Sequence, residues 1–204
     1  YQYASLYNEA LANDGRAPVY SDADLAAYQN GSDPYGHPDI NWYDEVLKKQ
    51  TPFSSYTLNA SGSNESVHYF VSLDYLNQKG LFKGSDINTY STNSDYQRYI
   101  FRSNVSVELS KSLSLYVNLF GRIRDQNAPG SGTQSIFNSL LATPANAYPI
   151  LNPDSSLAGN VNFSDNIYGQ SVMSGYTSTV YSDGYADLGV KYDLGNLVKW
   201  LWVK

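Results

Sequence analysis

Residues that could perform catalysis are few in this sequence, and they do not form a recognisable catalytic pattern. The only histidines are His37, in a Pro-rich turn, and His68, on the polar side of an alternating segment. Because the chain contains no Cys, a nucleophilic triad would need Ser or Thr, and no G-x-S-x-G turn is present. The segment 130–133 is Gly-rich but lacks the Lys of a phosphate-binding loop. We therefore expect no catalytic residues, no paired-histidine metal site and no enzymatic activity.

Acidic and amide residues suggest metal binding only weakly. Asp44 and Glu45 are adjacent on an expected helix, where they would point about 100° apart, so they cannot flank one glycosidic bond. Oxygen-bearing side chains at alternate positions occur in two loops: Asp22 and Asp24, and Asn152, Asp154 and Ser156. Either group could hold a calcium ion, but neither completes an EF-hand pattern. We expect no cofactor.

The composition narrows the class of protein. Tyr accounts for 20 of 204 residues, apolar types for 42%, and the mean hydropathy is -0.43. No stretch of the sequence approaches the roughly 18 to 20 consecutive apolar residues that a membrane-spanning helix needs. This criterion does not apply to the strands of a barrel, because only alternate residues of such a strand face lipid. The net charge of -6 leaves no basic stripe for phosphates, so nucleic acid is not expected as a partner. The lack of Cys is compatible with an oxidising envelope compartment.

Residues 1–53 have helical and loop-like patterns. Tyr3, Leu6, Tyr7, Ala10 and Leu11 share one face of an expected first helix that ends near Gly15. Short helices are also predicted after Ser21, with Asp24 completing a capping box and Gly31 as the stop, and over 42–49.

From Ser54 onward the pattern changes to the period of two that is typical of strands. The alternation predicts about six strands: 54–61, 66–77, 99–110, 113–124, 186–194 and a last one from Trp200. The turns near Gly62, Lys111 and Asn196 are short, whereas the connections 78–96 and 125–181 are long, the second with a helix at 135–141. In a transmembrane barrel short turns are periplasmic and long loops extracellular, which would orient the strands.

One side of the predicted strands is polar. Its candidate functional residues, expected to face a barrel lumen or a plug domain inside it, are Arg102, Asn104, Glu108, Asn118, Arg122 and Arg124. Charged side chains are tolerated on that side because they meet water or protein and not lipid.

Two folds fit this pattern. Alternating Tyr-rich strands also occur in soluble β-sandwiches, including glycan-binding modules that use aromatic side chains as stacking platforms. Strands of about eleven or twelve residues and the regular change between short and long loops favour an antiparallel transmembrane β-barrel segment, 54–204.

Several short sequence motifs, in their order along the chain, resemble those of the SusC/RagA family of TonB-dependent outer-membrane transporters. They lie along the whole chain: Asn8-Glu9-Ala10, Pro18-Val19-Tyr20-Ser21-Asp22, Gly31-Ser32-Asp33-Pro34-Tyr35, His37-Pro38-Asp39, Trp42-Tyr43-Asp44-Glu45-Val46-Leu47-Lys48, Val67-His68-Tyr69-Phe70-Val71-Ser72-Leu73, Tyr99-Ile100-Phe101-Arg102-Ser103-Asn104-Val105 and Gly121-Arg122. Each motif alone is only weakly specific for this family, whereas the combination in this order is specific for it.

The resemblance implies an importer of glycans or peptides in the outer membrane of a Gram-negative bacterium. Such proteins are barrels of 22 strands in contact with outer-membrane lipid, closed by an N-terminal plug, energised through TonB and covered by a SusD-like lipoprotein. The chain lacks the positions of the plug and the TonB box. By this resemblance, residues 1–53 are a connection on the extracellular side, and the chain follows the first barrel strand.

Overall fold

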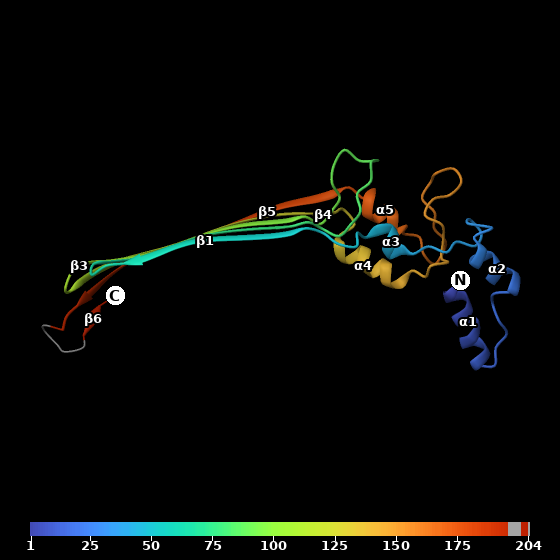
Figure 1. The fold of residues 1–204 in the computed structure, drawn as a ribbon, viewed down its shortest axis with the longest axis horizontal. Helices are drawn as coiled ribbons and strands as arrows, with labels where there is room; N and C mark the ends of the chain where they lie inside the picture. Colours follow the sequence, from blue (N-terminus) through green and yellow to red (C-terminus); the bar gives the residue numbers. More distant parts are fainter. Residues whose placement is uncertain (196–200, 204) are drawn as a thin grey trace. The chain divides into compact units, whose positions relative to one another are not determined.

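The computed structural model describes residues 1–195 and 201–203, and these divide into two compact units (Figure 1). The helical unit comprises Tyr1–Gln50, Leu81–Ser94 and Ala128–Thr177. The sheet unit comprises Thr51–Gly80, Asp95–Asn127 and Ser178–Lys204. Each unit is therefore assembled from three separate stretches of the chain.

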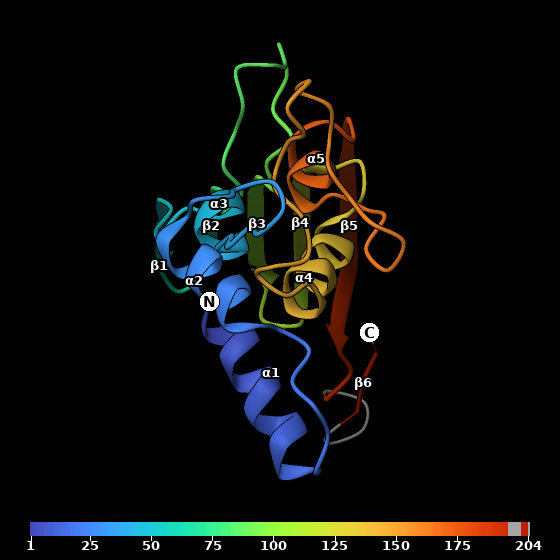
Figure 2. The ribbon, with the colours of Figure 1, turned by 90° about the vertical axis from the view of Figure 1, so that its right-hand side faces the viewer.

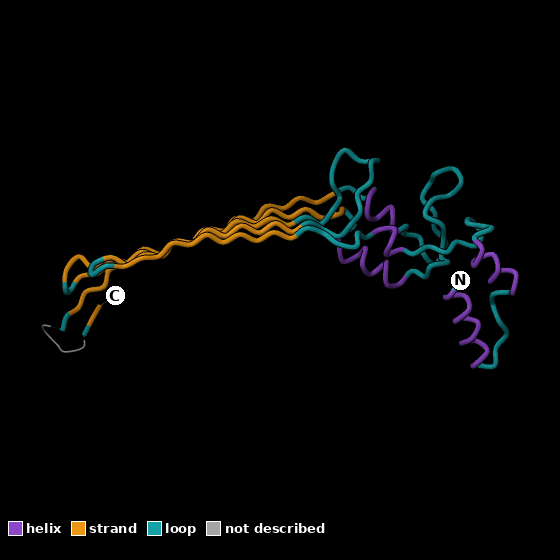
Figure 3. The backbone as a smooth tube through the Cα atoms, viewed as in Figure 1, coloured by secondary structure: helices purple, strands orange, loops and turns teal. Residues whose placement is uncertain are grey.

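Six strands form one antiparallel sheet in sequence order, which confirms the predicted strand number and mostly β class. The strands are β1 (Phe53–Ser63), β2 (Val67–Gln78), β3 (Tyr96–Ser110), β4 (Leu113–Pro129), β5 (Tyr176–Asp193) and β6 (Trp202–Val203). Figure 3 shows β1 to β5 running side by side as one layer. The predicted start of the last strand at Trp200 and the turn near Asn196 lie outside the described residues.

The register places the apolar residues of neighbouring strands on one face. Tyr56 pairs with Tyr75 and Tyr75 with Tyr99, and Val105 lies between Tyr69 and Val117. Large apolar side chains on this face are exposed, for example Leu58 at 70% and Leu188 at 76%. Val105, Val107, Leu115 and Val117 are partly exposed and belong to no buried core. Within the described residues no second sheet covers them, so the sandwich alternative receives no support.

The strands are longer than the alternation predicted. β4 continues to Pro129 and β5 begins at Tyr176, so the long connection is 130–175 and not 125–181. Strand pairing continues through polar positions, since Gln97 pairs with Asp125 and Tyr96 with Gln126. The backbone ladder needs no apolar side chains, which is why a hydrophobic pattern underestimated both strands. For the same reason the connection between β2 and β3 is 79–95 and not 78–96.

Five short helices belong to the helical unit (Figure 2). They are α1 (Gln2–Asn13), α2 (Asp22–Asn30), α3 (Trp42–Val46), α4 (Thr133–Ala142) and α5 (Ile167–Val172). The capping box of α2 is present as predicted, and Gly31 ends the helix in the left-handed conformation with φ 66°. Among the described residues, no helix is both long enough and apolar enough to cross a membrane.

Three helix predictions need correction. α3 ends at Val46 and not at residue 49, because Leu47 forms a β-bridge with Phe82 and the Lys48 N–H donates to the Leu81 carbonyl. In α1 the buried residues are Ala4 and Leu11, whereas Leu6 is 64% exposed. The helix expected at 135–141 is α4, which is slightly longer, and α5 was not predicted.

The core of the helical unit joins segments that are distant in sequence. Its buried members are Trp42, Val46, Phe82, Ile136, Leu140, Tyr148, Ala158 and Ile167. The Trp42 and Tyr148 rings lie 4.9 Å apart, and the Trp42 indole N–H donates to the Pro144 carbonyl at 3.2 Å. Residues 42–47, the β2–β3 connection and the β4–β5 connection therefore fold together.

Candidate functional site

The six sequence-predicted residues lie on the same, polar face of the sheet. In β3, Arg102, Asn104 and Glu108 occupy alternate positions, and the register pairs Asn104 with Asn118 of β4. Arg122 and Arg124 follow at alternate positions in β4 and share the face of Asn118.

Aspartates of β5 pair with the β4 residues on this face. Asp183 accepts a hydrogen bond from Nε of Arg122 at 2.8 Å and forms an ion pair with its Nη2 at 2.6 Å. Arg124 Nη2 lies 3.8 Å from the same carboxylate. Asn118 donates to Asp187 at 3.3 Å. Both aspartates lie in β5. The two faces of this strand are hard to recognise from the sequence, because its apolar side contains Ser182 and Gly184.

Aromatic rings alternate with these charges. The Arg102 guanidinium lies 5.5 Å from the Phe120 ring centroid, and the Arg124 guanidinium lies 4.8 Å from that of Tyr181. Such cation–π contacts are stabilising at partly desolvated sites.

Two arginine side chains on this face have a hydrogen-bond donor without a partner among the described residues. The Nε atoms of Arg98 and Arg124 are buried and have no hydrogen-bond partner within the described part of the chain. Arg98, which sequence analysis omitted, pairs with Arg124 in the β3–β4 register. Because both Nε atoms are inaccessible, they are unsatisfied donors within the sheet face and do not by themselves indicate a ligand.

The opposite face carries a row of aromatic rings. Tyr56 and Tyr75 stack with ring centroids 6.2 Å apart, and Tyr75 and Tyr99 lie 5.0 Å apart. The next pair on this face toward the long connections, Asn77 with Gln97, is polar. A tyrosine row between apolar and polar side chains is typical of a membrane–water boundary.

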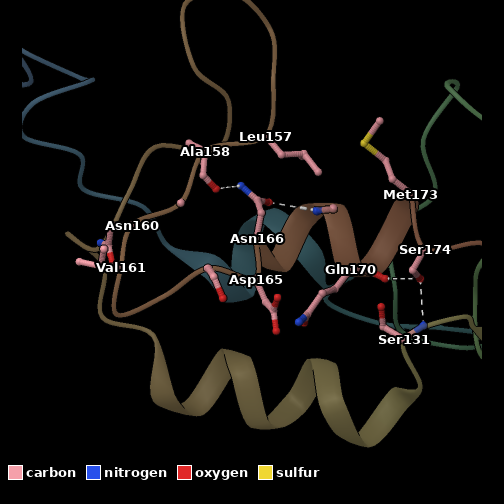
Figure 4. Close-up of a pocket in the computed structure, with 13 residues that line it drawn as sticks. Ser131, Leu157, Ala158, Asn160, Val161, Asp165, Asn166, Gln170, Met173 and Ser174 are labelled. Atoms are coloured by element: carbon pink, nitrogen blue, oxygen red, sulfur yellow. Dashed lines mark hydrogen bonds between the residues drawn. The ribbon is translucent and has the colours of Figure 1, made fainter.

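A cavity of about 670 Å³ with a mixed polar and apolar lining lies in the helical unit beside α5 (Figure 4). Asn166 organises its wall, since its side chain donates to the carbonyls of Ile150 and Ala158 at 2.8 Å and accepts from the Gly169 N–H at 3.0 Å. Asp165 and Gln170 point to the same side of α5. The hydroxyl, amide and carboxylate groups that line this cavity are able to form hydrogen bonds with a ligand.

The two calcium candidates have their carboxylates engaged locally. Asp24 accepts from the Ser21 N–H at 2.8 Å, and the Ser21 hydroxyl is also within hydrogen-bond distance. Asp154 accepts from the Ser156 N–H at 3.0 Å and from its hydroxyl at 2.6 Å. Side-chain hydrogen bonds lower the pKa of both carboxyls, with Ser21 the largest cause for Asp24 and Ser156 for Asp154. Both groups therefore stabilise a helix start or a turn.

Comparison with known proteins identifies the family to which the chain is related. No family model matches the chain. The TonB-dependent receptor P26 of Formosa agariphila is 31% identical over 169 residues, which cover 76% of this chain and 16% of that protein. The chain thus spans less than a fifth of the length of this curated relative.

Two solved structures share the fold. The RagAB peptide transporter matches 93% of this chain with a TM-score of 0.52 and 17% identity, and 23% of its own chain is covered. The RagAB peptide importer in the closed-closed state matches 86% of this chain and 20% of its own, with a TM-score of 0.51 and 17% identity. The sequence match therefore places the chain in the family of TonB-dependent receptors, and its fold is that of the matching part of RagAB.

Proposed function

We propose that this chain forms part of the wall of an outer-membrane β-barrel that imports glycans or peptides into a Gram-negative bacterium. The observation that carries the proposal is the two-faced sheet, with exposed aliphatic and tyrosine side chains on one face and paired charges on the other. Lipid would contact the apolar face, since exposed apolar side chains are stable there and not in water.

The polar face would surround the lumen and contact a plug domain. Arg102, Asn104, Glu108, Asn118, Arg122 and Arg124 would meet water or plug side chains. TonB would act through that plug. In this role the chain moves a substrate and does not transform it.

The connections β2–β3 and β4–β5 leave the same end of the sheet, and the turns β1–β2 and β3–β4 at the other end are short. This asymmetry supports an extracellular location for the connections. A SusD-like lipoprotein is the partner that the family resemblance implies for them. The similarity to RagAB favours peptides as substrates, and the glycan alternative remains part of the proposal.

Deleting the gene of the full-length protein tests this function. We expect the mutant bacterium to lose uptake of one class of fluorescent cargo, either oligosaccharides or oligopeptides, and to regain it when the gene is restored. Collapse of the proton gradient should abolish the same uptake in wild-type cells. Unchanged uptake of both classes in the deletion strain, or a protein absent from purified outer membranes, would contradict the proposal.

A further inference from the structure

A cavity interrupts the apolar face of the sheet unit. Its volume is about 620 Å³, within the range of small-ligand sites. Its lining residues on this face come from β1 to β5: Tyr56, Leu58, Leu73, Tyr75, Tyr99, Phe101, Gly121, Ile123 and Ser182. We call this cavity the glycine groove, because its floor lies at Gly121.

The floor of the glycine groove is backbone. Arg122 of β4 contacts Asp183 of β5. In antiparallel strands the residue before Arg122, Gly121, then lies opposite the residue after Asp183, Gly184. Among the described residues, nothing lies within 4 Å of the position that a Cβ on Gly121 would take. The groove therefore exists because two neighbouring strands lack side chains at the same height.

A glycine elsewhere in the sheet is covered by the ring of its pair partner. Gly62 pairs with Tyr69, and the Tyr69 ring lies 2.8 Å from the position of a Cβ on that glycine. Gly121 also has an aromatic pair partner, Phe101, but the Phe101 ring leaves it uncovered. An unfilled groove loses dispersion contacts along its walls, so a ligand that fills it is stabilising.

The glycine groove suits an apolar ligand. Its charged lining residues belong to the opposite face of the strands, where they are paired. There Asp74 accepts from the Thr57 hydroxyl at 2.7 Å, and Asp183 accepts from Arg122 Nε at 2.8 Å. The groove itself thus presents aliphatic and aromatic carbon and no charge to a ligand.

The register gives the depth of the groove in a membrane. Phe101, the pair partner of Gly121, is two positions from Tyr99, which is about 7 Å along the strand and about 5 Å along the membrane normal at a typical tilt. The groove therefore opens just below the row of Tyr56, Tyr75 and Tyr99, in the leaflet nearer to the long connections. Under the proposed function this is the outer leaflet, where lipopolysaccharide is the main lipid of a Gram-negative outer membrane.

A cation lies at the depth of the lipid headgroups. Lys79 follows Tyr75 by four positions, about 13 Å along the strand and about 10 Å along the membrane normal. Strand pairing continues to it, since its N–H donates to the Pro52 carbonyl at 3.2 Å. The Lys79 ammonium pairs with Asp95 at 2.9 Å and its side chain is 40% exposed, so it keeps hydrogens for a phosphate.

We propose that the glycine groove binds one acyl chain of lipid A, the membrane anchor of lipopolysaccharide, with a headgroup phosphate near Lys79. Lipid A carries several saturated chains on one phosphorylated headgroup, so one chain fills the groove while its neighbours cover Leu58 and Leu73. The inference rests on the proposed function, because only a barrel in the outer membrane presents this face to lipid A.

Native mass spectrometry of the full-length protein in a mild detergent tests the site. The probes are a hexa-acylated, bisphosphorylated lipid A and dipalmitoyl phosphatidylethanolamine, added separately to delipidated protein. We expect the first lipid A molecule to bind about tenfold or more tightly than the first phospholipid. Gly121→Phe, whose ring occupies the groove, should weaken lipid A binding by about fivefold or more, and Lys79→Gln should weaken it by about threefold.

Leu119→Phe is the matched control. Leu119 lies two positions from Gly121 on the same face of β4, is 38% exposed and does not line the groove. The variant adds the same ring to a lipid-facing position and should bind lipid A like wild type. Gly121→Leu is a smaller replacement that also fills the groove, and it takes the place of Gly121→Phe if that variant does not assemble.

The inference is overturned if the phospholipid binds as tightly as lipid A, if the groove-filling variant binds lipid A as tightly as Leu119→Phe, or if Lys79→Gln binds it like wild type. Its failure is distinguishable from failure of the proposed function, because membrane location and uptake are measured separately. A protein that is found in outer membranes and imports cargo, but shows no preference for lipid A, would contradict only the lipid site.

Discussion

At the scale of single residues, His37 joins two acidic side chains. Its Nε2 lies 3.0 Å from Asp24 Oδ1 and its Nδ1 lies 2.9 Å from Asp33 Oδ2. Hydrogen bonds to Asp24 and then Asp33 raise the pKa of His37. Hydrogen bonds from Ser21 and then His37 lower the pKa of Asp24 to about 2. This cluster therefore links the start of α2 to the turn after it.

The stabilising effect of the cluster should depend on pH. A raised His37 pKa means that its contribution is complete below the ordinary value of 6.5 and is lost as pH rises through the folded pKa. The Asp24 contribution is complete above 3.8 and is lost as pH falls through about 2. We expect hydrogen exchange of the amides at 21–24 to be slowest, after correction for intrinsic rates, between about pH 4 and pH 6.5.

His37→Gln is the control, because it removes the titrating ring and keeps a polar side chain. Corrected exchange in this variant should no longer change between pH 6 and pH 9. Equal corrected exchange at pH 5.5 and pH 9 in the wild type would show that the cluster does not titrate in this way.

At the scale of the elements, neighbouring residues of β3 should differ in their tolerance of charge. Val105 lies on the apolar face six positions from Tyr99, which is about 20 Å along the strand and about 15 Å along the membrane normal at a typical tilt. It would then lie near the middle of the bilayer. Asn104 lies on the polar face, paired with Asn118.

We expect Val105→Arg to destabilise the assembled full-length protein by about 2 to 4 kcal/mol, and Asn104→Arg to have little effect. The measurement is the amount of folded protein in outer membranes, detected by its altered mobility in unheated gel samples. If both variants assemble equally well, or if Asn104→Arg is the more damaging, the assignment of the two faces is wrong.

The junction between β4 and α4 tests packing in the helical unit. The Gly130 N–H donates to the Gly175 carbonyl at 3.0 Å, and a Cβ on Gly130 would lie 1.9 Å from the Ser174 carbonyl oxygen. Since that neighbour is backbone, Gly130→Ala should cost about 1 to 3 kcal/mol of unfolding free energy. Gly84→Ala is the control, with nothing within 4 Å of its Cβ. Denaturant unfolding should show a loss for Gly130→Ala alone.

At the scale of the whole molecule, the exposed apolar face determines which solvent the chain requires. Leu58, Leu73 and Phe101 lie on adjacent strands of that face and are 70%, 51% and 38% exposed. An uncovered surface of this kind, with open sheet edges, is prone to aggregation in water.

We therefore expect the isolated 204-residue chain to aggregate in buffer and to remain monomeric in a mild detergent, as judged by analytical ultracentrifugation. Replacing Leu58, Leu73 and Phe101 together by Lys should increase the monomeric fraction without detergent. A wild-type chain that is monomeric and folded in buffer alone would contradict the lipid-facing assignment.

The sequence by itself determined the number of strands and the two faces of the segments with clear alternation, because side chains in a strand alternate strictly and each face meets one kind of surroundings. Strand number, the short turn at Lys111, the capping box of α2 and the shared face of the six polar residues followed from local pattern. What only the tertiary structure decided depends on residues distant in sequence. The Arg122–Asp183 ion pair, the polar extension of β4 and β5 and the early end of α3 arise from pairing with another segment. The cavity lined by Tyr3, Tyr7, Tyr20 and Tyr28 also required the β4–β5 connection to pack against the N-terminal helices, which no periodicity encodes.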